Sequence, residues 1–378
     1  MSRMLVILIL LHAYVGARLL PDQPFGAIGT MLGMAMLVAS AGLIPFGFRA
    51  RRVAPRRRPD WKLWAGLTAI GAFSSLFVLT LLRDAGLLVA IALHAAFPDA
   101  VPLGSLLRWS AVAVPALAAL VTLTGFVNAR RVAAVRSIDI PIESLPPALH
   151  GFTIAQITDV HVGPTIGRAH VEAIVGVVNG LRADLVAITG DLVDGTVRHL
   201  AHHTAPLAHL TARHGTYFVT GNHEYYSGVR PWVAELRRLG VHVLLNEHVV
   251  LDHDGAAIVV AGVTDHSAHH YDSQHRSDPA AAIAGAPEAV GMRLLLAHQP
   301  RSAFAAVRAG FHLQLSGHTH GGQFLPWNFF VRLQQPFTAG LGRLGTLWVY
   351  TSRGTGYWGP PKRLGVPSEI TRIRLVPA

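Results

Sequence analysis

Long apolar runs fill most of the first third of the chain. Four of these runs approach the ~20 residues that a helix needs to cross the hydrocarbon core of a membrane. They cover residues 4–20, 26–48, 61–82 and 105–127. The first run is short and carries His12 and Arg18, so a cleaved signal peptide is its alternative interpretation. The pattern predicts a transmembrane region of about four helices over residues 1–138, in which the short run 86–97 lies at the interface or re-enters the membrane.

Arginine-rich loops indicate how these helices are oriented. Residues 49–60 read RARRVAPRRRPD, and three arginines follow the fourth run within residues 130–136, whereas the turns at 21–24 and near Pro98 hold almost no basic residue. Because cytoplasmic loops of membrane proteins are rich in Lys and Arg, both Arg-rich loops are expected to face the cytoplasm. We therefore expect an amino terminus inside the cell, four crossings and a cytoplasmic second segment. Cleavage of the first run would instead place the second segment outside.

Beyond residue 138 the chain changes to short apolar runs separated by Gly, Pro, Asp and Asn, which is the pattern of alternating strands and helices. Five of these runs end in polar residues, namely FTIAQITD, RADLVAITGD, GTYFVTGN, MRLLLAHQP and FHLQLSGHTH. Helical spacing appears at residues 168–181 and 231–239, and Asp254 followed by Gly255 marks a hairpin. The pattern predicts a layered α/β fold with polar residues beyond the carboxyl ends of its strands, where open sheets bind ligands.

The composition agrees with this division. Hydrophobic residues make up 51% of the chain and the mean hydropathy is +0.39, which is too high for an ordinary soluble protein. Residues 1–138 hold 14 Lys and Arg against 4 Asp and Glu, and residues 139–378 hold 18 against 17, so the net charge of +11 belongs almost entirely to the first segment. The second segment has no basic stripe interleaved with aromatic residues, so we expect no nucleic-acid partner. Cysteine is absent, which excludes disulfides and thiolate metal sites.

The polar strand ends carry side chains that suit a metal ion. They are Asp159 and His161 in TDVH, Asp191 in GDLVD, Asn222 and His223 in GNHE, His298 in AHQP, and His318 and His320 in GHTH. A D-x-H or H-x-H pair that leaves a strand places both side chains on one side. Carboxylate, imidazole and amide oxygen without thiolate suit Mn²⁺, Zn²⁺, Fe or Co²⁺. One such fragment arises easily by chance, but five in order at strand ends predict a metal centre.

These fragments resemble the pattern of the calcineurin-like metallophosphoesterase superfamily, which is D-x-H, G-D-x-x-D/N, G-N-H-D/E, a lone H and G-H-x-H. Here the pattern stands as DVH at 159–161, GDLVD at 190–194, GNHE at 221–224, His298 and GHTH at 317–320. The tail, with GHTHGGQ and then TSRGTGYWGPPKRLGVPSEI, is similar to the membrane-associated phosphodiesterase branch and departs from it slightly at Lys362-Arg363 and Pro367-Ser368-Glu369. The resemblance implies a domain over residues 150–378, built of two packed β-sheets flanked by helices.

The resemblance also implies two metal sites. One metal would be held by Asp159, His161, Asp191 and His320, and the other by Asp191, Asn222, His298 and His318. A shared Asp191 agrees with physical expectation, because two cations about 3.5–4 Å apart repel each other, and a water shared between them becomes hydroxide near neutral pH. His223 is expected to act on the substrate, either by donating to a phosphoryl oxygen or by protonating the leaving group. Its alternative role is that of a supporting residue.

Several further polar residues have two open interpretations each. Asp194 and Glu224 fit carboxylates that orient ligand histidines, and they fit plain loop caps equally well. Arg353 fits a phosphate contact or a surface ion pair. A histidine cluster fits a solvated loop or the border of a substrate entrance, and it comprises His266, His269, His270 and His275.

Together these features predict a membrane-anchored, metal-dependent phosphoester hydrolase, either a phosphodiesterase or a pyrophosphatase, in which a bridging hydroxide attacks phosphorus. Membrane lipids are expected partners, and a lipid-linked substrate is a further hypothesis. One alternative is a non-catalytic binding or regulatory module that keeps the fold. The other alternative, a transporter or sensor, would show ionisable residues within the membrane, and the four long runs carry only His12, Arg18, Lys62 and Arg108.

Overall fold

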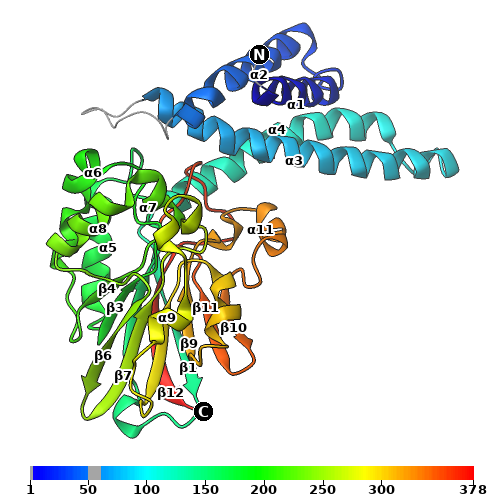
Figure 1. Cartoon of the computed structure of the whole chain (residues 1–378). Helices are drawn as coiled ribbons and strands as arrows, with labels where there is room; N and C mark the ends of the chain where they lie inside the picture. The colour runs from blue at the N-terminus through cyan, green and yellow to red at the C-terminus, as the bar shows by residue number, and fades with distance from the viewer. Residues whose placement is uncertain (1–2, 50–60) are drawn as a thin grey trace. The chain divides into compact units, whose positions relative to one another are not determined.

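The computed structural model describes residues 3–49 and 61–378 (Figure 1). Within these residues the contacts divide the chain into two compact units. The helical unit comprises residues 3–49, 61–128 and 359–362, and the α/β unit comprises residues 129–358 and 363–378. The arginine-rich stretch that supports the predicted orientation lies, from residue 50 to residue 60, outside the described residues.

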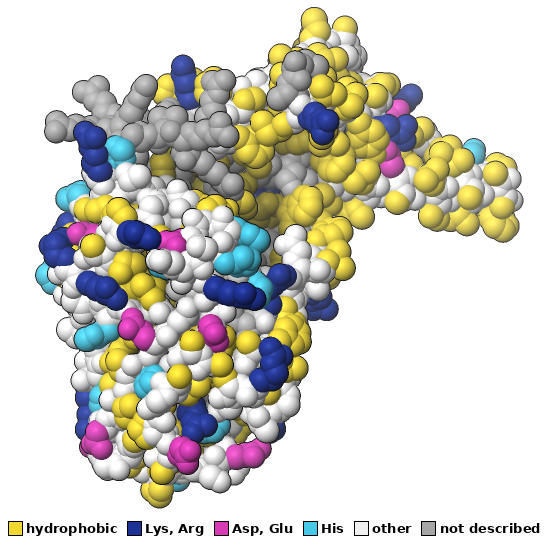
Figure 2. All heavy atoms as spheres, viewed as in Figure 1, with side chains coloured by type: hydrophobic (Ala, Val, Ile, Leu, Met, Phe, Trp, Pro, Cys, Tyr) yellow, Lys and Arg dark blue, Asp and Glu magenta, His cyan; other side chains and the backbone are white. Residues whose placement is uncertain are grey.

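Four helices form the helical unit: α1 (Arg3–Leu19), α2 (Gly26–Arg49), α3 (Trp61–Ala96) and α4 (Leu103–Arg130). Helices α2, α3 and α4 are long and apolar enough to cross a membrane, whereas α1 has 17 residues. Their outward side chains are apolar too, since Ile28 is 69% exposed and Leu88 is 70% exposed. Figure 2 shows hydrophobic side chains spread over the surface of these helices. Such an all-apolar surface suits lipid rather than water.

The run 86–97 does not form the separate interfacial or re-entrant piece that its length suggested. Helix α3 continues through this run and is 36 residues long. The two charged residues that precede the run lie inside this helix, and both are paired. Arg83 is buried and donates to Asp22 at 2.5 Å, and Asp84 accepts from Arg18 at 2.8 Å. The helix continues past these paired charges.

Two six-stranded sheets form the α/β unit (Figure 1). The first has the order β1 (Ala134–Ile142), β12 (Glu369–Pro377), β2 (Thr153–Ile157), β3 (Leu185–Ile188), β4 (Thr216–Phe218), β5 (His242–Val243). The second has the order β10 (Gly340–Leu344), β11 (Leu347–Thr351), β9 (Leu313–Ser316), β8 (Met292–Leu296), β7 (Ala256–Gly262), β6 (Glu247–His253). Strands β2 to β5 are parallel to one another, as are β7, β8, β9 and β11. The predicted fold class is confirmed.

Alternate residues of the central strands face different layers. Val186 and Ile188 of β3 join the core that includes helices α5 (Arg168–Gly180), α6 (Val197–Thr204) and α8 (Val229–Arg238). Leu185 and Ala187 of the same strand join the core that both sheets share. Because both faces of the strand are covered, it is apolar at every position. Helices α9 (Pro279–Ile283) and α10 (Ala303–Ala306) pack on the outer face of the second sheet.

Local predictions in this unit are confirmed as well. The expected helices at residues 168–181 and 231–239 are α5 and α8, and the expected hairpin joins β6 to β7. Asp254 and Gly255 form its turn with φ angles of +55° and +86°. A two-residue hairpin loop of this kind needs positive φ at both positions, and Asp followed by Gly adopts that conformation readily.

Candidate metal centre

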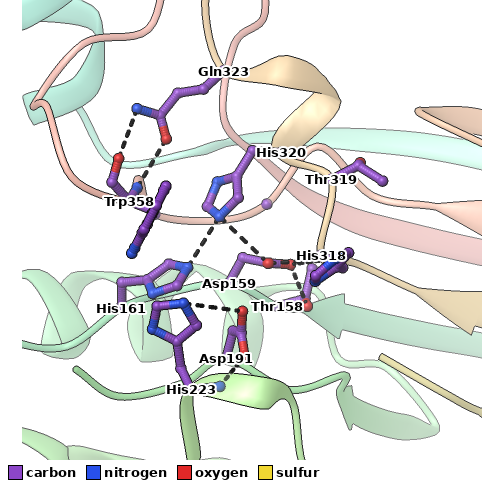
Figure 3. A network of polar contacts seen from close by, with 12 residues as sticks. Thr158, Asp159, His161, Asp191, His223, His318, Thr319, His320, Gln323 and Trp358 are labelled. Atoms are coloured by element: carbon purple, nitrogen blue, oxygen red, sulfur yellow. Dashed lines mark hydrogen bonds and ion pairs between the residues drawn. The ribbon is translucent and has the colours of Figure 1, made fainter. Parts of the chain in front are cut away.

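The loops that follow five strands bring the predicted ligands together (Figure 3). Asp159 and His161 follow β2, Asp191 follows β3, Asn222 and His223 begin the short helix α7 (Asn222–Ser227) after β4, His298 follows β8, and His318 and His320 follow β9. Strands β2, β3 and β4 belong to the first sheet, and β8 and β9 belong to the second. The site therefore lies where the carboxyl ends of parallel strands from both sheets meet.

One group of ligand atoms comes from Asp159, His161 and His320. Nε2 of His320 lies 3.0 Å from Nε2 of His161 and 3.4 Å from Oδ1 of Asp159, and all three side chains are buried. Burial, with the neighbouring Arg363 guanidinium, holds the pKa of His320 well below its ordinary value. The ring is therefore neutral, which is the form that binds a metal. Two imidazoles and a carboxylate that converge in this way fit a divalent cation.

A second group comes from Asp191, His298 and His318. Nε2 of His298 lies 3.1 Å from Oδ2 of Asp191 and 3.2 Å from Nδ1 of His318. Oδ1 of Asn222 is buried and has no hydrogen-bond partner among the described residues. An unpaired buried oxygen costs about 1–3 kcal/mol, and a cation beside it would remove that cost. These donors fit a second cation, while the bridging role of Asp191 stays a prediction.

Five of the expected ligands have left-handed backbone conformations. Their φ angles are +52° at Asp159, +54° at His161, +49° at Asp191, +70° at His318 and +49° at His320. The sequence pattern suggested that D-x-H and H-x-H continue the pleat of a strand, but β2 ends at Ile157 and β9 at Ser316. The side chains converge because the residues just past each strand adopt a strained conformation. Strain of this kind is typical of functional sites.

Glycines next to the ligands allow the loops to approach one another closely. A Cβ atom on Gly317 would lie 2.1 Å from Oδ2 of Asp159, and one on Gly221 would lie 2.2 Å from Oδ1 of Asp191. Real Cβ contacts are never this short, so each position requires glycine in the present arrangement. The glycines of the G-N-H and G-H-x-H motifs are therefore explained by the space that the carboxylates occupy.

Asp194 connects His223 to the first group. Its Oδ1 accepts hydrogen bonds from Nδ1 of His161 at 3.1 Å and from Nδ1 of His223 at 2.5 Å. Burial lowers the pKa of His223, but the charges of Asp191 and Asp194 outweigh burial and raise this pKa to about 9. Nε2 of His223 lies 3.9 Å from Oδ2 of Asp191. His223 is therefore held beside the ligand atoms with a raised pKa, and Asp194 is the residue that orients its ring.

Glu224 has a different role from Asp194. Its carboxylate accepts hydrogen bonds from the backbone N–H groups of Gly221 at 2.6 Å, Asp191 at 3.0 Å and Leu192 at 2.8 Å. It therefore ties the loop after β3 to the start of α7. Of the two interpretations that the sequence left open for Glu224, these contacts support loop capping.

Known proteins are similar to this chain over the segment that carries these residues. The family model described as calcineurin-like phosphoesterase matches residues 152–322. The transmembrane protein with metallophosphoesterase domain from Bos taurus is 43% identical over 278 residues, which cover 69% of this chain and 62% of that protein. Its counterpart from Danio rerio is 36% identical over 330 residues, which cover 84% of this chain and 74% of that protein. The chain belongs to the calcineurin-like metallophosphoesterase family.

Family membership confirms the resemblance that the motifs indicated, including its membrane-associated branch. The metallophosphoesterase YkuE from Bacillus subtilis is 29% identical over 245 residues, which cover 61% of this chain and 81% of that protein. The chain spans less than two thirds of the length of the bovine relative. The relatives therefore establish the family, and the side chains of the site itself are the evidence for the activity of this metallophosphoesterase.

The buried Arg363 was not singled out as a functional residue by sequence reasoning. It is 1% exposed, its Nη2 lies 2.9 Å from Nδ1 of His320, and it donates to the carbonyl oxygens of His320 at 3.0 Å, Arg353 at 2.8 Å and Gly356 at 3.1 Å. Its only signal in the sequence was a departure from the branch pattern. The side chain of Arg353 itself lies 3.8 Å from Glu369, which supports the ion-pair interpretation for Arg353.

The histidine cluster divides into members with different surroundings. Nδ1 of His275 is hydrogen-bonded to the hydroxyl of Tyr225 at 2.8 Å. The rings of His269 and His270 pack on each other at 4.0 Å and both residues are exposed. His266 lines a cavity of about 410 Å³. The cluster is therefore partly a solvated loop and partly the wall of a cavity.

Proposed function

We propose that this chain is a membrane-anchored, metal-dependent hydrolase that cleaves phosphodiesters or pyrophosphates. The observation that supports this proposal most strongly is the convergence of two donor groups, one around His320 and one around His298, with Asp191 in the second group. Within each group the ligand atoms lie within 4.8 Å of one another. Membership of the metallophosphoesterase family agrees with this reading. Mn²⁺, Zn²⁺, Fe or Co²⁺ fits the donor set.

In this proposal each side chain of the centre has a role. Asp159, His161 and His320 would hold one cation, Asn222, His298 and His318 would hold the other, and Asp191 would serve both. Two cations bound there would supply a hydroxide near neutral pH to attack phosphorus and would stabilise charge on the phosphoryl oxygens. Asn222 contributes a neutral oxygen, which limits the negative charge in a site that must accept an anionic ester.

His223 has the role of the proton donor. Asp194 holds Nδ1–H of its ring, which leaves Nε2–H for the oxygen atom of the leaving group. Asp191 accepts a hydrogen bond from the backbone N–H of His223 at 2.9 Å, so the ring is fixed to the same carboxylate that serves the centre. As the P–O bond breaks, the proton on Nε2 passes to the departing oxygen and the ring becomes neutral.

The three apolar helices support a multi-pass membrane anchor for this enzyme. We place the α/β unit on the cytoplasmic side, because residues 49–60 and 130–136 are rich in arginine and arginine-rich loops of membrane proteins face the cytoplasm. A catalytic unit tethered at a membrane encounters lipid substrates at high local concentration. A lipid-linked phosphodiester or pyrophosphate is therefore the physiological substrate that the architecture favours.

The decisive test uses the detergent-purified full chain with Mn²⁺ added. Hydrolysis of bis-p-nitrophenyl phosphate and of p-nitrophenyl phosphate is measured beside an Asp191→Asn variant, and bound metal is quantified by mass spectrometry. We expect the wild-type chain to cleave the diester and to bind two metal ions per chain, and the variant to lose both properties. Absence of cleavage from a chain that holds two ions would contradict the hydrolase and favour a binding module.

A further inference from the structure

Three exposed aromatic side chains stand beside the proposed proton donor. Tyr226, Tyr271 and Trp358 are 52%, 56% and 39% exposed, and we call them the aromatic rim. The ring of Trp358 lies 5.8 Å from that of His223 at an interplanar angle of 84° (Figure 3). Tyr226 lies 5.1 Å from His223, and Tyr271 lies 5.3 Å from Tyr226. Large exposed rings gathered at one place indicate a binding surface.

Trp358 is held in place from the metal centre itself. The side-chain oxygen of Gln323 accepts from the backbone N–H of Trp358 at 2.8 Å, and its side-chain nitrogen donates to the backbone carbonyl of Trp358 at 3.0 Å (Figure 3). Gln323 is buried and follows the expected ligand His320 by three residues. The amide thus forms a two-point clip that couples the position of Trp358 to the G-H-x-H loop.

Tyr226 is held from the other motif. It belongs to α7, whose first two residues are Asn222 and His223. The hydroxyl of the preceding residue, Tyr225, is bonded to His275, which anchors the loop that carries Tyr271. The rim is therefore preorganised, because each of its rings is fixed to a segment that also carries or anchors a residue of the centre.

The position of the rim assigns it to one part of the substrate. His223 delivers its proton to the oxygen of the leaving group, so the organic group attached to that oxygen lies next to His223. Trp358 and Tyr226 both border His223, and all three side chains of the rim are aromatic. Flat, rigid rings stack on other rings, whereas flexible chains pack better against flexible aliphatic side chains.

We propose that the aromatic rim binds a planar, ring-bearing leaving group, such as the base of a nucleotide, and that the Gln323 clip sets this specificity through Trp358. This inference rests on the proposed hydrolase. It names the leaving-group class that the site selects. One stacked base contributes enough to change affinity by about ten-fold or more.

A matched pair of inhibitors tests the rim. Adenosine 5′-monophosphate and ribose 5-phosphate carry the same phosphate and sugar and differ by the base alone, and butyl phosphate offers a flexible chain instead. Their inhibition constants are measured against bis-p-nitrophenyl phosphate with the metal-loaded full chain, and phosphate release is followed in parallel. We expect the adenine compound to bind about ten-fold more tightly than the other two.

Three variants connect this selectivity to the named residues. Trp358→Ala and Gln323→Leu should each bring the ratio of the inhibition constants of ribose 5-phosphate and the adenine compound close to one. Neither should change the bound metal or the inhibition constant of ribose 5-phosphate. Phe329→Ala is the control, because Phe329 is 61% exposed and lies outside the rim. The Phe329→Ala variant should keep the wild-type ratio of the inhibition constants of ribose 5-phosphate and the adenine compound.

The possible failures are distinguishable. If a wild-type chain cleaves the diester but is inhibited equally by ribose 5-phosphate and the adenine compound, the proposed role of the rim is wrong and the proposed hydrolase activity stands. Tighter binding of butyl phosphate than of the adenine compound would show that the rim takes an aliphatic chain, which also overturns the inference. Loss of diester cleavage in a fully metal-loaded wild-type chain would instead count against the hydrolase itself.

Discussion

The residues of the candidate metal centre depend on unusual local geometry. A left-handed conformation costs about 1–3 kcal/mol at a residue with a Cβ atom, and five of the expected ligands adopt it. Contacts from other loops offset that cost. The carboxylate of Asp159, for example, accepts from the backbone N–H of His318 at 3.0 Å and from the hydroxyl of Thr158 at 2.7 Å. A centre that is held by such contacts should respond strongly to one added methyl group.

Gly317→Ala tests this sensitivity. The new Cβ would lie 2.1 Å from Oδ2 of Asp159, so we expect loss of bound metal, loss of activity and destabilisation by about 1–3 kcal/mol. Metal content and thermal unfolding are the measurements. Gly176→Ala is the control, since a Cβ there meets nothing within 4 Å and alanine is favoured over glycine in a helix. Equal behaviour of the two variants would contradict the packing explanation.

Arg363→Met removes a buried cation and leaves its acceptors without donors. We expect destabilisation of the α/β unit by about 3 kcal/mol or more, because His320 and the carbonyl oxygens of Arg353 and Gly356 lose hydrogen bonds while buried. Weaker metal binding should accompany it, because the carbonyl oxygen of His320 loses a donor that fixes the loop carrying this expected ligand. Calorimetric metal titration and thermal unfolding measure both effects. Normal affinity and normal stability would show that Arg363 is dispensable.

His223→Asn separates proton donation from metal binding. We expect kcat to fall by about 100-fold or more for an ester with an alkyl alcohol as leaving group, because that oxygen must be protonated as it departs. The loss should be much smaller for a p-nitrophenyl ester, whose leaving group is stable as an anion. Metal content should stay at the wild-type value. The same loss for both esters would exclude the acid role, and the exposed His209→Asn is the control.

At the scale of secondary structure, the functional residues lie just beyond the carboxyl ends of short strands. Strand β4 is three residues long and is followed, after residues 219–221, by α7, which begins with Asn222 and His223. Helix α3, by contrast, is 36 residues long and continues past Arg83 and Asp84. Both elements contact other segments: Asp191 accepts from the backbone N–H of His223 in α7, and Arg83 and Asp84 of α3 pair with Asp22 and Arg18.

Arg83→Leu tests the ion pairs around α3. Besides its contact with Asp22, Arg83 donates to Ser110 at 2.8 Å and to the carbonyl oxygen of Arg18 at 2.8 Å, so it connects the ends of several helices in the helical unit. Removing one partner of a buried ion pair costs about 3–5 kcal/mol, and we expect lower thermal stability in detergent. Arg108→Leu, at an exposed position, should unfold as the wild type does. Equal melting temperatures of the two variants would show that the ion pairs around Arg83 do not contribute to thermal stability.

At the scale of the whole molecule, a helical unit and an α/β unit share one chain. The net charge divides between them very unevenly, because residues 1–138 carry 14 basic and 4 acidic side chains. This imbalance, together with the three apolar helices, supports an anchored enzyme with its basic loops in the cytoplasm.

A reporter fused after Ala378 tests that placement. The carboxyl terminus follows β12 of the α/β unit, so the reporter shares the side of the membrane on which that unit lies. We expect a fused green fluorescent protein to fluoresce and a fused alkaline phosphatase to be inactive. An active phosphatase would show that the α/β unit is exported and would point to cleavage of the first apolar run.

Much of this architecture was predictable, because it rests on local patterns. The length of the long apolar runs predicted the helices of the first segment, and short apolar runs separated by turn residues predicted the α/β layers. Polar residues at the strand ends predicted which side chains would gather. The behaviour of run 86–97 was not predictable from its length. Helix α3 runs through it, and the partners of Arg83 and Asp84 in that helix, Asp22 and Arg18, are distant in sequence.

The sequence by itself determined the family, the fold class and the residues that form the candidate metal centre, because motif spacing and hydrophobic period are properties of neighbouring residues. Only the tertiary structure decided how those residues are held. Several ligands adopt left-handed backbone conformations. Contacts between loops that follow different strands hold the site, namely those of Glu224, of the buried Arg363 and of the clip between Gln323 and Trp358. Such contacts have no signature in a local pattern, since they exist only once both sheets have brought their strand ends together.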